Sequence, residues 1–195
     1  MKTVAVSQRI DAFPDRNETR DALDQRMMFF IQACGFMPFP VPNTLKGSVC
    51  QWLDTLQPAA IVLSGGNDIG HCAERDFTDL SLLKYAWERR LPLLGICRGM
   101  QMIGHWAGVE LEKVNGHVNT RHLIIGSISK EVNSFHNFSL ATCPKNFSVL
   151  ARSEDEKIEA IRNLSSPWEG WMWHPEREKK FSDVDIQRVR ALFQV

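Results

Sequence analysis

Short apolar runs alternate with longer segments of helical periodicity over the first half of the chain. Three runs have the length and the aliphatic character of buried strands: Thr3–Ser7, Ala59–Leu63 and Leu91–Ile96. The apolar spacing between these runs predicts helices over Asp21–Cys34, about Val49–Leu56, about Leu80–Arg90, and from Gly99 to about Ala107. Phe36–Val41 carries two prolines, which indicates an extended segment near the edge of a sheet.

From about residue 117 onward the pattern changes to short β-like runs. These are His122–Ile128, Val132–Leu140, Ser148–Ala151, Ile158–Arg162 and Gly170–His174, followed by an expected helix over Asp183–Phe193. Alternating strands and helices are typical of a parallel sheet covered on both faces, to which the later runs add antiparallel or mixed strands. We therefore expect an α/β fold, in which a doubly wound, mostly parallel sheet carries helices on both faces, as a single domain over residues 1–195.

Composition fits a soluble globular protein without a strongly charged partner. The 195 residues include 23 basic and 23 acidic side chains, and 44% are hydrophobic. Zero formal net charge gives no reason to expect nucleic acid or a membrane surface as a partner. The N-terminal segment turns polar at Ser7, too early for the apolar stretch of a signal peptide. We expect a cytoplasmic protein.

The cysteines agree with a reducing compartment. They lie at positions 34, 50, 72, 97 and 143, an odd number without a Cys-x-x-Cys pair. This pattern excludes a fully paired disulfide framework and provides no zinc-ligand spacing. The sequence accordingly predicts free thiols, no metal site and no cofactor.

One cysteine stands in a motif of its own. Gly95-Ile96-Cys97-Arg98-Gly99 joins an expected strand to an expected helix in the Gly-x-nucleophile-x-Gly form of a nucleophile elbow. The following helix directs its N-terminal N–H groups and its dipole at the Cys97 sulfur, which favours the thiolate. Taken alone, the pentapeptide equally fits a buried cysteine flanked by glycines that serve packing.

Two other segments could complete a catalytic site. In Trp173-His174-Pro175-Glu176, residues two apart point the same way, so Glu176 can orient the His174 imidazole toward a nucleophile. Without a nucleophile, such a pair is usually a surface ion pair. Gly65 and Gly66 follow the strand Ala59–Leu63, where bare backbone N–H groups can approach a ligand or simply form a tight turn.

Together these motifs resemble the class I glutamine amidotransferases. The resemblance rests on LSGGND, on GICRGMQ around Cys97 and on WMWHPER around His174 and Glu176, in that order along the chain. It implies that Cys97 attacks the γ-carbonyl of a glutamine-like side chain. His174 would then act as base and as acid, and Glu176 would orient it. Backbone N–H groups of Gly66 and Arg98 would receive the oxyanion.

The same resemblance implies substrate contacts. Gln101 stands where family members hold the glutamyl portion, and His136, Asn137 and Phe138 match a loop that grips its α-amino and carboxylate ends. Asn137 replaces a glycine of several amidotransferases, which leaves its backbone contacts open. The segments VNSFHNF and SEDEKIEAI more closely resemble the stand-alone γ-glutamyl hydrolases, such as γ-glutamyl-GABA hydrolase.

Several basic residues remain without an assigned role. Arg9, Arg16 and Arg20 follow the first strand and either contact a leaving group, with phosphate as one candidate, or lie in a solvated loop before a helix capped by Thr19 or Asp21. The stretch RNETRDALDQR resembles hydrolases of γ-glutamyl nucleotide phosphoramidates in bacterial capsule synthesis. His117 and His122 are five apart with no accompanying carboxylates, a spacing that favours pocket-lining residues over metal ligands.

Three functions remain open. A stand-alone hydrolase would cleave a small γ-glutamyl amide to glutamate and an amine. A glutaminase subunit would use the same residues and pass ammonia to a separate synthase. A non-catalytic sensor would bind a γ-glutamyl ligand, but the presence of Cys97, His174 and Glu176 argues against it. The resemblance favours the hydrolase.

Overall fold

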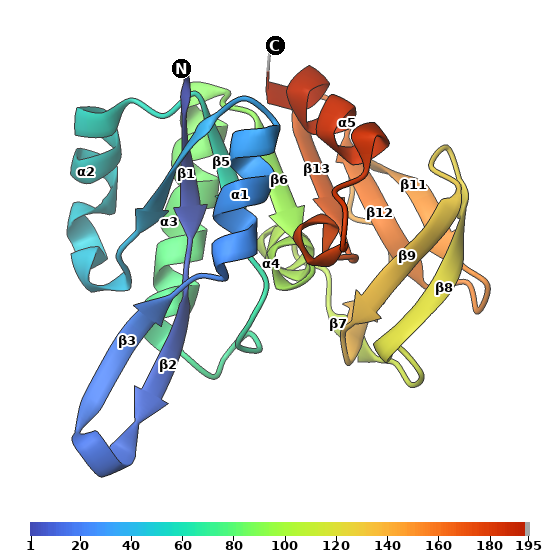
Figure 1. The fold of residues 1–195 in the computed structure, drawn as a ribbon, viewed down its shortest axis with the longest axis horizontal. Helices are drawn as coiled ribbons and strands as arrows, with labels where there is room; N and C mark the ends of the chain where they lie inside the picture. The colour runs from blue at the N-terminus through green and yellow to red at the C-terminus, as the bar shows by residue number, and fades with distance from the viewer. Residues whose placement is uncertain (194–195) are drawn as a thin grey trace.

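The computed structural model describes residues 1–193, which fold around a nine-stranded sheet with the order β4-β1-β5-β6-β13-β12-β11-β8-β9 (Figure 1). The parallel half consists of β4 (Met37–Val41), β1 (Thr3–Ser7), β5 (Ala60–Leu63), β6 (Leu93–Ile96) and β13 (Trp168–Trp171). The antiparallel half adds β12 (Ile158–Asn163), β11 (Phe147–Ser153), β8 (Val118–Gly126) and β9 (Lys130–Phe135). This division confirms the expected change from parallel to antiparallel pairing.

Helices cover both faces of the parallel half. α1 (Gln25–Ala33) and α5 (Asp183–Phe193) pack on one face, and α2 (Val49–Leu56), α3 (Ala73–Arg89) and α4 (Arg98–Trp106) pack on the other (Figure 1). In β1, Val4 and Val6 belong to the core on the side of α1 and α5, while Ala5 belongs to the core on the side of α2, α3 and α4. Successive side chains of a strand point to opposite faces of the sheet. The predicted α/β class is therefore confirmed.

Strand β4 lies at the outer edge of the sheet, as its prolines predicted. It pairs with β1 on one side, and Pro38 and Pro40 have no N–H group to offer a further strand. The expected strands β1, β5 and β6 are likewise present, with ends that agree within two residues.

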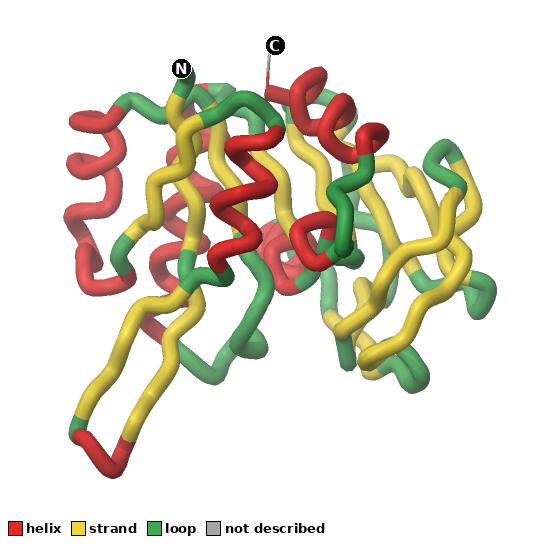
Figure 2. Tube along the Cα trace, in the orientation of Figure 1, coloured by secondary structure: helices red, strands yellow, loops and turns green. Residues whose placement is uncertain are grey.

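The segment after β1 differs from the expected loop and helix. β2 (Arg9–Phe13) and β3 (Glu18–Ala22) form an antiparallel hairpin, with the short helix η1 (Pro14–Arg16) at its tip, that projects from the body of the protein (Figure 2). The predicted helix over Asp21–Cys34 is wrong at its start. α1 begins at Gln25, and its cap is Asp24, whose side chain accepts a hydrogen bond from the Arg26 N–H at 2.9 Å. Neither face of the hairpin is buried, so its sequence carries no alternating apolar pattern.

Other boundaries also differ from prediction. β8 begins at Val118 rather than His122, and β13 covers Trp168–Trp171 where Gly170–His174 was expected. α3 begins at Ala73 rather than near Leu80, because its first turns bury the charged residues Arg75 and Asp79 instead of apolar ones. The run expected over Val132–Leu140 is divided into β9 and the separate β10 (Phe138–Leu140), which pairs with β7 (Leu111–Lys113). The remaining short helices are η2 (Asn43–Ser48) and η3 (Pro175–Arg177). Among the described residues, no helix has both the length and the apolar character needed to cross a bilayer.

Candidate active site

Cys97 lies in a sharp turn between β6 and α4. Its backbone has φ 51° and ψ −106°, a conformation that costs energy for any residue with a side chain, and its N–H donates to the carbonyl of Trp171 at 2.6 Å. Neither flanking glycine has room for a side chain, since a β-carbon on Gly95 would lie 2.5 Å from the carbonyl carbon of Gly99 and one on Gly99 would lie 2.2 Å from the carbonyl oxygen of Leu63. The turn therefore needs both glycines and holds Cys97 at the N-terminus of α4, with 7% of its surface exposed.

His174 and Glu176 form a buried pair directly after β13. Nδ1 of His174 lies 2.6 Å from Oε1 of Glu176, and His174 also interacts with the Cys97 sulfur. Burial of the imidazole favours its neutral form, but the negative charges of Glu176 and Cys97 outweigh burial and raise the pKa of His174 to about 9. The three side chains predicted from separate motifs therefore lie together.

Residues from two other elements fix this pair. Asn133 on β9 donates from Nδ2 to the carbonyl of His174 at 2.8 Å and accepts from the His174 N–H at 2.9 Å. Arg26 on α1 donates from Nε to the carbonyl of Glu176 at 2.8 Å. The backbone is therefore anchored at both residues, while the Glu176 carboxylate on Nδ1 orients the imidazole.

The Gly65–Gly66 loop lies against His174. A β-carbon on Gly65 would come within 2.6 Å of Cε1 of His174, so a larger residue would displace the imidazole. Gly66 has φ +116°, a conformation that L-residues rarely adopt. Position 65 therefore requires glycine because the backbone approaches His174 closely, and position 66 requires glycine because of its backbone conformation.

A buried arginine, which no sequence motif singled out, supports this loop. Arg75 on α3 donates from Nη2 to the carbonyls of Ser64 at 2.9 Å and Gly65 at 2.7 Å. In a trans peptide the carbonyl and the following N–H point in opposite directions. Fixing the Gly65 carbonyl toward Arg75 therefore turns the Gly66 N–H away from Arg75.

Arg75 belongs to an ion network with Arg98, the residue after Cys97. Arg98 pairs through its two terminal nitrogens with Asp79 and Asp76, and Nε of Arg75 lies 3.8 Å from the same Asp79. Arg75, Arg98 and Asp79 are almost fully buried. The network joins the loop after β5 to the elbow after β6. The sequence signal for it is the (i, i+4) spacing of Arg75 and Asp79.

The predicted substrate residues divide into two groups. Nε2 of Gln101 donates to the carbonyl of Phe138 at 2.9 Å, and Nδ1 of His136 donates to the same oxygen at 3.1 Å. The ring of His136, however, faces His117, with 4.7 Å between ring centroids, and Asn137 is exposed. The structure therefore brings Gln101 and Phe138 together and places the His136 imidazole in a separate polar cluster.

That cluster was not expected from the sequence. His117, His122 and His136 surround the buried carboxylate of Glu159, and Asp155 lies 3.1 Å from His117, so the expectation that no carboxylates accompany these histidines is wrong. Burial raises the pKa of Glu159, but the three imidazoles outweigh burial and hold it well below its usual range. Neither His117 nor His122 lines the cavity beside His174.

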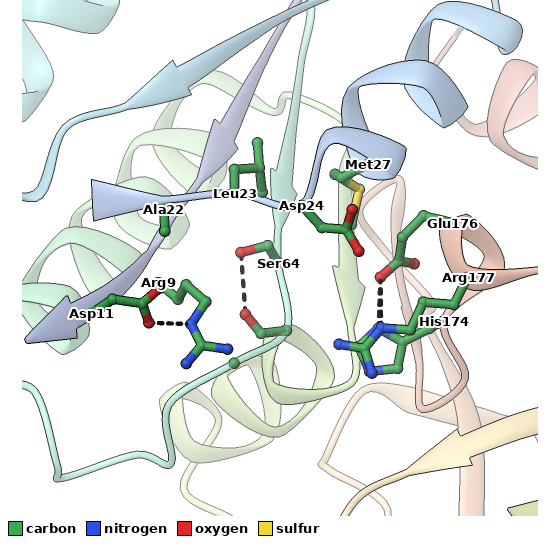
Figure 3. Close-up of a pocket in the computed structure, with 12 residues that line it drawn as sticks. Arg9, Asp11, Ala22, Leu23, Asp24, Met27, Ser64, His174, Glu176 and Arg177 are labelled. Carbon is green, nitrogen blue, oxygen red and sulfur yellow. Dashed lines mark hydrogen bonds and ion pairs between the residues drawn. The ribbon is translucent and has the colours of Figure 1, made fainter. Parts of the chain in front are cut away.

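This cavity of about 320 Å³ opens beside His174 (Figure 3). Arg9 and Asp11 lie on one side of it, and His174, Glu176 and Arg177 lie on the other. The remaining lining residues are Ala22, Leu23, Asp24, Met27, Ser64, Gly65 and Gly66. Arg16 and Arg20 do not line it, because they lie farther along the hairpin, where Arg20 pairs with Glu18.

Comparisons with known proteins agree with this arrangement. The family model described as "Glutamine amidotransferase class-I" matches residues 34–190. A γ-glutamyl-CDP-amidate hydrolase of Campylobacter jejuni is 30% identical over 94% of both chains. A glutamine-hydrolysing GMP synthase subunit from Thermococcus kodakarensis is 29% identical over 76% of this chain and 80% of its own length. A solved structure from Thermoplasma acidophilum, described as a GMP synthase subunit, superposes with a TM-score of 0.75 at 21% identity, covering 100% of this chain and 93% of its own, which shows a common fold.

Proposed function

The chain belongs to the class-I glutamine amidotransferases, amidohydrolases with a cysteine nucleophile, and we propose that Cys97, His174 and Glu176 hydrolyse a γ-glutamyl amide. The observation that carries the proposal is the buried His174–Glu176 pair, 2.6 Å apart, beside a cysteine held in a strained elbow. Cys97 attacks the γ-carbonyl as a thiolate, so that a sulfur–carbon bond forms and the carbonyl oxygen takes the negative charge.

Two backbone N–H groups stabilise that oxyanion. They belong to Gly66, turned by the anchored Gly65 carbonyl, and to Arg98 at the first position of α4. A donor of this kind contributes about 2.7–4 kcal/mol to transition-state stabilisation in comparable sites. Collapse of the intermediate breaks the carbon–nitrogen bond while His174 gives a proton to the departing nitrogen.

The γ-glutamyl thioester that remains is hydrolysed in the second half of the reaction. His174, now neutral, takes a proton from water as the water attacks the thioester carbon. Glutamate leaves and Cys97 returns as a thiolate paired with the imidazolium. Glu176 stabilises that imidazolium in both halves of the reaction.

The two sides of Cys97 suit different parts of the substrate. Gln101 and Phe138 lie on the side of α4 and β10, where we assign the glutamyl portion. The cavity beside His174 takes the leaving group, because His174 must reach the departing nitrogen. The guanidinium groups of Arg9 and Arg177 there suit a phosphorylated leaving group, as the name of the C. jejuni relative suggests.

The alternative is a glutaminase subunit that supplies ammonia to a synthase. The similarity to the GMP synthase subunit of T. kodakarensis supports it, and the chemistry at Cys97 would be the same. The hydrolase is favoured because the hydrolase relative matches over 94% of the chain, against 76% for the GMP synthase subunit. A non-catalytic sensor would have no need of the Cys97–His174–Glu176 arrangement.

Glutamate release by the purified chain alone separates these functions. The substrates are glutamine, γ-glutamyl-GABA, other γ-glutamyl amines and a γ-glutamyl nucleotide phosphoramidate, with Cys97→Ala as the control. We expect turnover of a γ-glutamyl conjugate in preference to glutamine, and none in the Cys97→Ala variant. Glutamine hydrolysis that appears only after a synthase subunit is added would favour the alternative, and turnover by Cys97→Ala would overturn the mechanism.

A further inference from the structure

We propose that His117, His136 and Glu159 form a binding site for a divalent transition-metal ion of the Zn²⁺ type, distinct from the Cys97 site. Nδ1 of His117, Nε2 of His136 and a carboxylate oxygen of Glu159 all lie within 4.8 Å of one another. His117 immediately precedes β8, His136 lies in the turn after β9, and Glu159 lies on β12. All three are buried, so the ligand atoms converge inside the protein.

The hydrogen bonds around the two histidines fix which nitrogen carries the proton. Nε2 of His117 contacts a carboxylate oxygen of Asp155 at 3.1 Å, and Nδ1 of His136 contacts the carbonyl of Phe138 at 3.1 Å. Both partners are acceptors, so each of these nitrogens must carry the hydrogen. In the neutral rings the other two nitrogens therefore present lone pairs.

Those two lone pairs point into the same space. Nδ1 of His117 and Nε2 of His136 are 3.3 Å apart, and two unprotonated nitrogens cannot hydrogen-bond to one another. The third group there, the Glu159 carboxylate, is also an acceptor. Three acceptors facing one another in a buried site need either added protons or a metal cation between them, and imidazole nitrogens with a carboxylate suit Zn²⁺.

The distances fit a metal as well. Four ligands at about 2.0–2.1 Å from Zn²⁺ in a tetrahedron lie about 3.3 Å from one another. Oε1 of Glu159 is 3.5 Å from Nδ1 of His117 and 3.3 Å from Nε2 of His136. Among the residues that the structure describes, neither oxygen of Glu159 has a hydrogen-bond partner, although the side chain is 1% exposed.

The surroundings complete the pattern of a metal site. Asp155 and the Phe138 carbonyl each hold the outer nitrogen of one histidine ligand, as carboxylates and backbone carbonyls do behind the histidines of zinc sites. Nε2 of His122 lies 3.4 Å from Oε1 of Glu159 and has no hydrogen-bond partner within residues 1–193, which makes it the candidate for a fourth ligand.

Burial indicates what the ion would do. His117, His136 and Glu159 leave no open approach for a substrate, so the ion would be structural. It would join the residue before β8 and the strand β12 to the turn between β9 and β10. Phe138 begins β10 directly after that turn, and its carbonyl accepts from both His136 and Gln101, so the ion would hold one edge of the active site.

The test measures metal binding by the full chain without an affinity tag. Chelator-treated protein is titrated with Zn²⁺ and with Co²⁺, and the metal content after gel filtration is determined by elemental analysis. The Cys97→Ser variant is measured in parallel, because the thiolate is itself a metal ligand. We expect one ion per chain in both proteins, and a tetrahedral Co²⁺ spectrum without a thiolate charge-transfer band.

Matched variants locate the site. His117→Ala and Glu159→Gln should bind Zn²⁺ at least about 100-fold more weakly, while His105→Ala, which removes an exposed histidine at the end of α4, should bind it normally. No ion bound by the Cys97→Ser chain at micromolar Zn²⁺ would overturn the proposal and leave protonated imidazoles as the cations of the cluster. Unchanged binding by folded His117→Ala and Glu159→Gln would also overturn it.

Discussion

Gly65 lies so close to His174 that a β-carbon at position 65 would come within 2.6 Å of Cε1 of the imidazole. Gly65 follows β5, whereas His174 follows β13, so the contact spans two separate strand ends at the carboxyl edge of the sheet. The glycine loop therefore sets the position of the imidazole in addition to carrying the Gly66 N–H.

Replacing Gly65 by alanine should impair catalysis more than folding. The added methyl group forces His174 away from Cys97, and a displacement of about 1 Å in such a site can cost about 100-fold in rate. We expect kcat to fall by about that factor while the melting temperature changes little. Gly47→Ala is the matched control, because a β-carbon there meets nothing within 4 Å. Equal loss of activity in both variants would contradict this interpretation.

Arg75 should act on the rate through the Gly66 N–H. Arg75→Met removes the hydrogen bonds to the Ser64 and Gly65 carbonyls, which frees the loop to turn the N–H away from the oxyanion. Loss of one oxyanion donor lowers kcat by about 100- to 1,000-fold. The rate at which iodoacetamide alkylates Cys97 should change only slightly in Arg75→Met, because that reaction needs no oxyanion donor.

The control for Arg75 lies on the same helix. Arg89 of α3 is exposed and pairs with Asp54, so Arg89→Ala should leave kcat unchanged. If Arg75→Met loses alkylation and catalysis to the same extent, Arg75 supports the whole site rather than the glycine loop.

The pH profile should report the charge of Glu176. Although burial lowers it, the carboxylate and the Cys97 sulfur raise the pKa of His174 to about 9, so the imidazolium that protonates the leaving nitrogen is lost only above that pH. In Glu176→Gln the raising charge is gone, and the alkaline fall of kcat should move to lower pH. A profile that keeps its alkaline limb in Glu176→Gln would show that another group controls it.

The same shift has a consequence for stability. A histidine whose folded pKa lies above its unfolded value of about 6.5 stabilises the fold fully below that pH, and the contribution is lost as the pH rises through about 9. The free energy of unfolding of the wild type, measured with denaturant, should therefore decrease as the pH rises between these two values. The decrease should be smaller in Glu176→Gln.

Arg9 should discriminate between substrates. It lines the cavity assigned to the leaving group, so Arg9→Ala should raise KM for a γ-glutamyl nucleotide phosphoramidate by about 10-fold, the loss of one charge-assisted contact. KM for γ-glutamyl-GABA should stay the same. Arg16→Ala, at the tip of the same hairpin, is the control and should affect neither substrate. An equal rise in KM for both substrates would argue against a phosphate contact.

The sequence predicted the parts of the site that depend on local chemistry. The elbow needs glycines at 95 and 99 because a β-carbon on Gly95 would meet the Gly99 backbone and one on Gly99 would meet the Leu63 carbonyl, and that requirement is visible as a spacing. His174 and Glu176 pair as their spacing predicted, but the short helix η3 (Pro175–Arg177) brings them together rather than the extended segment that we expected. The strands β1, β5 and β6 were likewise predictable, because burial on both faces makes them almost continuously apolar.

What the sequence left open depends on contacts between distant segments. Arg75 and Asp79 look like surface charges in a helix, and only the packing of α3 against the elbow buries them beside Arg98. Glu159 on β12 is separated from His117 along the chain by β8, β9, β10 and β11, so their proximity has no local signal. The hairpin β2–β3 buries neither face and therefore lacks the alternation by which strands are recognised.

The proposed mechanism depends on a γ-glutamyl thioester at Cys97, which intact-protein mass spectrometry of acid-quenched reactions can detect. With a turned-over γ-glutamyl substrate, the wild-type chain should gain the mass of one γ-glutamyl group, located on the peptide that contains Cys97. The Cys97→Ser variant should neither gain that mass at this peptide nor release glutamate at the wild-type rate. Release of glutamate at the wild-type rate by Cys97→Ser would contradict the mechanism.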